Sequence, residues 1–214
     1  MIQPSGEFLA FGEEDFYRVT GGLRDKVRAH IESISESDLR QADQDALAEQ
    51  IIQRFTLAAP SLDFDHIQKT GSERLVEDYS GFGAVMASAT GGSRQVRRQV
   101  VTYHIPVKGD TTLLRYRPSS FSFSAPRVYL QGSQNDRELC FDVVRQSNNP
   151  SDAQRDLEWV RGEAERNINQ LRTLSERQVE DASKFNDQMR AEVPQLIAAR
   201  KQRLQGNDDF LSQL

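Results

Sequence analysis

The hydrophobic pattern changes twice along this chain of 214 residues, and this change constrains the fold more than any single motif. In both flanks apolar residues recur every three or four residues, the spacing of one helix face, whereas in residues 94–146 they fall into strand-like runs. Charge divides in the same way, because residues 94–146 hold nine Lys/Arg against four Asp/Glu and both flanks are net acidic. We therefore expect an α+β protein with a net basic sheet and acidic helices.

The first 60 residues are predicted to be helical. Residues 14–34 place their apolar side chains on one helix face, which Gly21 and Gly22 interrupt at a kink or a break. A second helix has its clearest pattern in residues 47–57, and Pro60 ends it or follows its end. The candidate caps at the start of this second segment are Ser35, Ser37 and Asp38.

Residues 61–146 are predicted to form an antiparallel β-meander of four to six strands. A short strand is expected near residues 62–67, and the glycine-rich residues 80–94 are expected to form a mobile loop or a loose hairpin. Four later runs have stronger strand character: 95–107, 111–118, 121–131 and 138–146. The segments between them are short and rich in turn-forming residues, which favours antiparallel neighbours.

A polar segment at residues 147–151 marks the sharpest boundary, so we expect an α+β domain in residues 1–150 and a helical arm in residues 151–214. Ser151 is the candidate cap of the arm, Pro194 either kinks it or opens a second helix to make a helical hairpin, and Gly206 should end it soon after. The arm either covers the sheet or pairs with a protein partner or another copy of the chain. The predicted interaction residues are Leu157, Val160, Ile168, Leu171, Phe185 and Met189.

Composition narrows the class of protein. No apolar run is long enough to cross a membrane and the N-terminus lacks the pattern of a signal peptide, so a cytoplasmic location and no membrane partner are expected. The single cysteine, Cys140, excludes an internal disulfide and favours a buried small hydrophobe over a reactive thiol.

No motif of the chain predicts catalysis, a metal site or a cofactor. Asp63, Asp65 and His66 offer oxygen and nitrogen ligands, but His66 would point away from the two aspartates on a strand, so a solvated strand face is favoured. The other histidines, His30 and His104, lie far from His66 in sequence. Neither glycine-rich stretch, residues 80–83 (SGFG) or 90–94 (TGGSR), matches a phosphate-binding or dinucleotide-binding motif.

Six arginines form the strongest candidate binding site. If neighbouring strands align, the sheet would present several guanidinium groups beside tyrosines and bind phosphates of a nucleic acid or a nucleotide. Equally, these arginines could pair with acidic side chains of the same chain, which is favoured because the chain is net acidic. The six are Arg94, Arg97, Arg98, Arg115, Arg117 and Arg127.

Two segments resemble a known group of proteins. They resemble the N-terminal region of bacterial proteins that carry a C-terminal restriction-endonuclease-like domain, some of them in antiviral defence. The segments are residues 105–128 (IPVKGDTTLLRYRPSSFSFSAPRV) and residues 196–214 (LIAARKQRLQGNDDFLSQL), with a long charged helix between them. The resemblance covers about half of the chain and carries no catalytic residue. It implies a non-enzymatic accessory or assembly module that positions an effector or a partner chain. The alternative is a nucleic-acid or nucleotide sensor that uses the arginine-bearing sheet.

Overall fold

The computed structural model describes residues 6–77, 95–120, 125–133, 136–147 and 149–213. The chain is α+β, as predicted, and forms two compact units that each have their own core. The sheet unit comprises residues 1–13, 60–116 and 121–175, and the helical unit comprises residues 14–59, 117–120 and 176–214. The long helix α5 (Ala153–Leu211) contributes residues to both units.

The sheet unit is built on an antiparallel sheet of six strands. These are β1 (Phe8–Leu9), β3 (Ser61–Leu62), β4 (Gln68–Glu77), β5 (Gln95–Lys108), β7 (Arg127–Gln131) and β8 (Glu138–Val144). The order is β1-β7-β8-β5-β3, and β4 pairs with the remaining length of β5 on the β3 side. This order departs from a simple meander, because β8 rather than β7 lies beside β5 and the first strand, β1, lies beside β7.

The predicted strand at residues 111–118 is wrong for its first part. Residues Thr111–Arg115 form a 3₁₀ helix, and only Tyr116–Arg117 form a strand, β6. The side chain of Asp110 accepts hydrogen bonds from the backbone N–H and the hydroxyl of Thr112, which caps the turn. Leu113 and Leu114 are both buried, and a strand with one buried face could not bury two consecutive side chains. A 3₁₀ helix therefore follows β5 where a meander would have its next paired strand.

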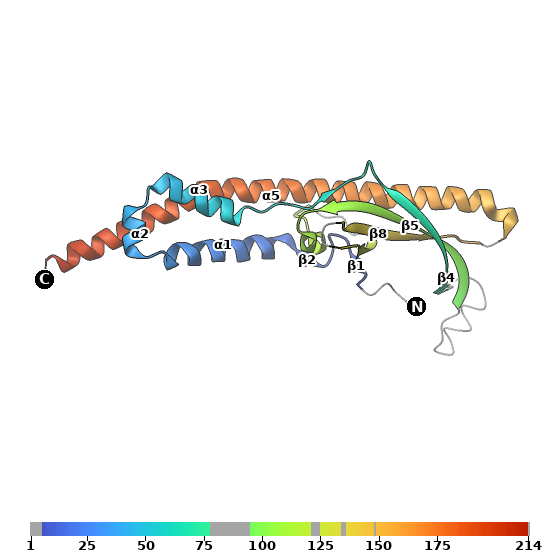
Figure 1. Ribbon diagram of the computed structural model, residues 1–214, viewed down its shortest axis with the longest axis horizontal. Helices are drawn as coiled ribbons and strands as arrows, with labels where there is room; N and C mark the ends of the chain where they lie inside the picture. The colour runs from blue at the N-terminus through green and yellow to red at the C-terminus, as the bar shows by residue number, and fades with distance from the viewer. Residues whose placement is uncertain (1–5, 78–94, 121–124, 134–135, 148, 214) are drawn as a thin grey trace. The chain divides into compact units, whose positions relative to one another are not determined.

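Strand alternation gives the sheet two different faces. Tyr103, Ile105 and Val107 of β5 point into a core that α5 closes with Val160 and Leu171, among others. Figure 1 shows the N-terminal part of α5 running along this face of the curved sheet. The opposite face, which we call the outward face, carries the alternate side chains, such as Thr102 and His104 of β5. The burial of an apolar helix stripe against one sheet face explains why this arm covers the sheet, as one of the two alternatives predicted.

The helical unit packs α1 (Phe16–Ser33), α2 (Glu36–Gln41) and α3 (Gln44–Phe55) with the last part of α5. Ser35 caps α2 by accepting a hydrogen bond from the N–H of Asp38, as one of the predicted caps. Helix α1 is continuous through Gly21 and Gly22, so the predicted interruption does not occur. The shared core buries Val27, Ile31, Ile51, Phe185 and Ile197, together with six further side chains.

Helix α5 continues through Pro194, so the hairpin alternative is wrong and the long arm is confirmed. Proline in a helix interior costs about 3 kcal/mol, but Val193 and Ile197 beside it are completely buried and offset that cost. The predicted end at Gly206 is also wrong, because the helix runs to Leu211. At its start, Asn149 rather than Ser151 caps a short 3₁₀ turn (Pro150–Asp152) that leads into α5. None of the described helices is long and apolar enough to cross a membrane.

Candidate functional site on the outward face of the sheet

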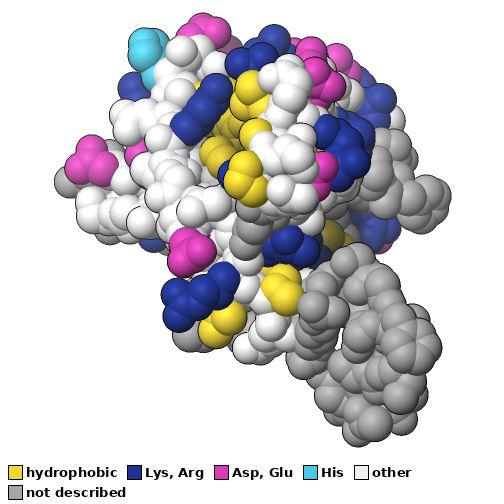
Figure 2. All heavy atoms as spheres, turned by 90° about the vertical axis from the view of Figure 1, so that its right-hand side faces the viewer, with side chains coloured by type: hydrophobic (Ala, Val, Ile, Leu, Met, Phe, Trp, Pro, Cys, Tyr) yellow, Lys and Arg dark blue, Asp and Glu magenta, His cyan; other side chains and the backbone are white. Residues whose placement is uncertain are grey.

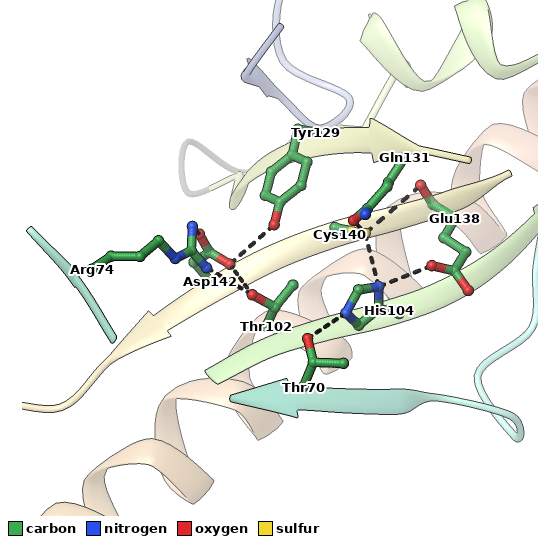
Figure 3. A network of polar contacts seen from close by, with 9 residues as sticks. All are labelled: Thr70, Arg74, Thr102, His104, Tyr129, Gln131, Glu138, Cys140 and Asp142. Atoms are coloured by element: carbon green, nitrogen blue, oxygen red, sulfur yellow. Dashed lines mark hydrogen bonds and ion pairs between the residues drawn. The ribbon is translucent and has the colours of Figure 1, made fainter. Parts of the chain in front are cut away.

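The outward face of the sheet gathers polar side chains from four strands (Figure 3). The register places His104 of β5 beside Cys140 of β8, and Cys140 beside Tyr129 of β7. One pair further along, Thr102 lies beside Asp142. Because paired residues share a face, nine side chains form two adjoining clusters. They are Thr70, Arg74, Thr102, His104, Tyr129, Gln131, Glu138, Cys140 and Asp142.

The first cluster surrounds the imidazole of His104. Its Nδ1 lies 2.9 Å from Glu138 Oε2 and 3.4 Å from Cys140 Sγ, while its Nε2 lies 2.8 Å from Thr70 Oγ1. The ligand atoms of His104, Glu138 and Cys140 all lie within 4.8 Å of one another. Cys140 is completely buried and His104 nearly so, whereas the Glu138 side chain is about one-third exposed. The thiol also approaches Gln131 Oε1 at 3.7 Å.

The geometry of this cluster does not suit a cysteine nucleophile. Burial, together with the nearby carboxylates of Glu138 and Asp142, raises the pKa of the Cys140 thiol to about 12. The thiol is therefore protonated at neutral pH in the metal-free protein. A nucleophilic triad uses one imidazole nitrogen for the nucleophile and the other for the acid, but here the thiol and Glu138 approach the same nitrogen. What the three groups share is a set of metal-ligating atoms.

The second cluster surrounds the carboxylate of Asp142. It accepts hydrogen bonds from Arg74 Nη1 at 2.7 Å, Thr102 Oγ1 at 2.6 Å and Tyr129 Oη at 3.2 Å. Arg74 also donates to Thr102 Oγ1 at 2.8 Å, so the network joins β4, β5, β7 and β8. Burial raises the pKa of the Tyr129 hydroxyl, which keeps it protonated and able to donate. This cluster is a satisfied structural network.

The predicted arginine site is not assembled as one surface. Arg94 lies outside the described residues. Arg115 lies in the 3₁₀ helix, donates to Glu13 at 2.6 Å and covers the ring of Phe8. Arg117 pairs with Asp15 at 3.6 Å.

The arginines of the strands also divide between the two faces. Arg97 points to the α5 side of the sheet and pairs with Glu73, whereas Arg98 and Arg127 share the outward face with Arg74. Figure 2 shows a face of the molecule on which Lys and Arg side chains lie among Asp and Glu side chains. The observed pairs agree with the expectation that arginines neutralise acidic side chains of the same chain.

The predicted interaction residues of the arm pack mostly within the chain. Val160 and Leu171 belong to the core of the sheet unit, and Ile168 packs against it. Phe185 and Met189 belong to the core of the helical unit. Only Leu157 is exposed. The helical stripe therefore predicts correctly that most of these side chains are buried, but they pack against other parts of the same chain.

The metal ligands considered from the sequence also differ from expectation. Residues 64–67 form a turn and not a strand, which brings the ring of His66 to 2.9 Å from Asp63 Oδ2. Both side chains are exposed, so this is a surface ion pair. The His104 cluster was missed, because it needs the β5–β8 register. The available signal was the spacing of Glu138 and Cys140, two residues apart on one strand face.

Comparisons with known proteins give no match, either to a family model, to a curated protein or to a solved structure. The resemblance to bacterial proteins with a restriction-endonuclease-like domain therefore stays a prediction.

Proposed function

We propose that the chain is a non-enzymatic assembly module that pairs with a second copy of itself through the last turns of α5 and thereby positions an effector. The observation that carries the proposal is the exposure of Phe210 and Leu211, which are 63% and 66% exposed. The last buried residue of α5 is Leu204, so the helix continues for about two turns beyond its core. Large apolar side chains presented on such a helix end favour association.

Gly206 favours a second copy as the occupant of this segment, because charged side chains on both sides of it are engaged within the chain. Arg203, before Gly206, pairs with Glu32, and Asp208, after it, pairs with Arg40. Two antiparallel copies that cross at Gly206 would meet where none of the described residues lies within 4 Å of an added Cβ. A glycine at the crossing lets the two backbones approach closely, and such a two-fold contact is self-complementary.

The family resemblance suggests the purpose of such pairing. In the bacterial proteins that the chain resembles, the effector is a restriction-endonuclease-like domain on the C-terminal side. Pairing near the end of α5 would bring two such domains together. We place the module in the cytoplasm, where a lone thiol such as Cys140 stays reduced.

Sedimentation velocity over a concentration series tests the proposal. We expect the mass of the purified chain to rise towards a dimer with concentration and to do so at high salt as well, because apolar contacts are not screened. The double variant Phe210→Ser/Leu211→Ser should stay monomeric. Tyr17→Ser, which removes another exposed aromatic side chain of the helical unit, is the matched control and should behave as the parent chain. A monomer at every concentration, or a dimer that the double variant leaves intact, would overturn the proposal.

A second candidate function is nucleic-acid or nucleotide binding, supported by the shared outward face of Arg98 and Arg127. Fluorescence anisotropy with labelled DNA and RNA at low and moderate salt tests it. Salt-sensitive binding that is lost in Arg98→Ala/Arg127→Ala would support this function, because phosphate contacts release counterions. No binding at low salt would leave these arginines without that role.

A further inference from the structure

We propose that His104, Glu138 and Cys140 bind a divalent transition-metal ion of the Zn²⁺ type on the outward face of the sheet. Their ligand atoms already lie within 4.8 Å of one another and come from two neighbouring strands, β5 and β8. This site lies in the sheet unit and does not depend on pairing through α5. It adds a ligand to a chain for which the sequence predicts none.

The donor set selects the class of metal. Imidazole nitrogen and thiolate sulfur suit Zn²⁺ and Co²⁺, whereas Mg²⁺ and Ca²⁺ require oxygen ligands throughout. One carboxylate oxygen from Glu138 completes three protein ligands. Binding displaces the thiol proton of Cys140, because the thiolate is the ligand, and the positive ion stabilises the sulfur anion despite its burial.

The spacing of the donors fits a tetrahedral ion with little movement. With Zn–N near 2.0 Å and Zn–S near 2.3 Å, tetrahedral geometry separates nitrogen and sulfur by about 3.5 Å. The observed distance between His104 Nδ1 and Cys140 Sγ is 3.4 Å. The same geometry separates nitrogen and oxygen by about 3.3 Å, against 2.9 Å observed for His104 Nδ1 and Glu138 Oε2. Glu138 has to adjust, because its oxygen must lie farther from Nδ1 and about 3.5 Å from Cys140 Sγ, and its side chain is the most exposed of the three.

The surroundings of His104 hold it in the orientation of a ligand. When Nδ1 binds the metal, Nε2 carries the proton and donates it to Thr70 Oγ1, which lies 2.8 Å away. Metal-binding histidines usually have such a partner on the second nitrogen, which fixes the ring and its tautomer. Thr70 is therefore a positioning residue. Gln131 Oε1, 3.7 Å from the sulfur, or a water entering beside Glu138 is available for the fourth position.

Absorption spectroscopy with Co²⁺ and competition for Zn²⁺ against a chromophoric chelator test the site. The full chain is first stripped of metal under reducing conditions. We expect one ion per chain, a thiolate-to-cobalt charge-transfer band that Zn²⁺ abolishes, and no competition by Mg²⁺. Thr70→Val should weaken Zn²⁺ binding by about 10- to 100-fold through loss of ring orientation.

Two ligand variants and one control keep the test decisive. Cys140→Ala should abolish the charge-transfer band, and Glu138→Gln, a change at a partly exposed position, should weaken Zn²⁺ binding while circular dichroism stays unchanged. His66→Ala removes a histidine that also contacts a carboxylate but has no thiol nearby, so it should leave binding unchanged. A folded parent chain without the charge-transfer band, or Zn²⁺ binding that survives both ligand variants, would overturn the proposal.

Discussion

In the sheet unit the polar side chains bond mainly to one another across strands, whereas in the helical unit many of them bond to the backbone near helix ends. Asp142 of the sheet unit holds three side chains from three different strands. In the helical unit, Arg200 donates to the carbonyls of Ile31 and Ile34, where α1 ends. Lys201 donates to the carbonyl of Ala42, which follows α2, at 2.8 Å.

The difference follows from what each kind of element leaves unsatisfied. A helix leaves its last four carbonyls without partners, and cationic side chains at those positions both bond and complement the helix dipole. A sheet satisfies its backbone internally, so the side chains of a polar face must find each other. The polar residues of the helical unit are thus occupied with structure, while those of the sheet can form a chemical site.

The largest expected effects come from the two separate cores. Leu171→Ala in the sheet unit and Ile197→Ala in the helical unit each remove a completely buried side chain, and each should lower the free energy of unfolding by about 2–5 kcal/mol. Hydrogen exchange should locate the damage, with protection lost first in β5 and β8 for Leu171→Ala and in α1 and α3 for Ile197→Ala. An equal loss of protection in both units from either change would contradict separate cores.

Breaking the side-chain network of the sheet should cost slightly less. Asp142→Ala removes the shared acceptor of Arg74, Thr102 and Tyr129 and should lower the free energy of unfolding by about 2–3 kcal/mol, measured by urea denaturation. Arg74 can partly recover by turning towards solvent, which limits the loss. Asp142→Asn keeps one acceptor oxygen and should lose less. Equal stability of the parent and Asp142→Ala would show that the network does not stabilise the fold.

The corresponding change in the helical unit is Arg200→Met, which keeps the packing stem and removes the donors to Ile31 and Ile34. We expect a loss of about 1–3 kcal/mol in the free energy of unfolding, because two carbonyls lose buried partners. Arg190→Met is the matched control on the same helix, since Arg190 is exposed and pairs only with nearby Asp187 among the contacts described. Arg190→Met should lower the free energy of unfolding by less than about 0.5 kcal/mol. Similar losses for the two variants would argue against a capping role for Arg200.

Much of the fold is predictable from local pattern. The helical spacing of residues 14–34 matches α1, and the alternation in residues 95–107 and 138–146 matches β5 and β8. Strand β4 was missed because Gln68–Glu77 is almost wholly polar, and its strand conformation follows from ten consecutive pairs with β5. Pro194 was overestimated as a break, since burial on both sides of it outweighs the lost hydrogen bond.

The candidate site was much less predictable than the fold. His104 and Cys140 are 36 positions apart in sequence, and their meeting depends on β8 lying beside β5 in one register. A shift of one residue would turn Cys140 to the opposite face. Local pattern does place Glu138 and Cys140 on one face, but nothing local selects His104 rather than another histidine as their neighbour.

The smallest expected effect concerns the exposed pair of His66 and Asp63, which has the same imidazole–carboxylate contact as the His104 cluster but no thiol. The hydrogen bond that protonated His66 donates to Asp63 raises the pKa of His66 above its ordinary value of 6.5, so its NMR titration midpoint should lie above that value and return towards it in Asp63→Asn. Because the folded pKa is raised, the contribution of His66 to stability is complete below the unfolded pKa and is lost as pH rises through the folded pKa. The pair is fully solvated, so added salt should lower the midpoint as it screens the attraction. A midpoint that neither salt nor Asp63→Asn moves would mean that the pair does not persist in solution, and the contrast with the enclosed His104 cluster would then rest on burial alone.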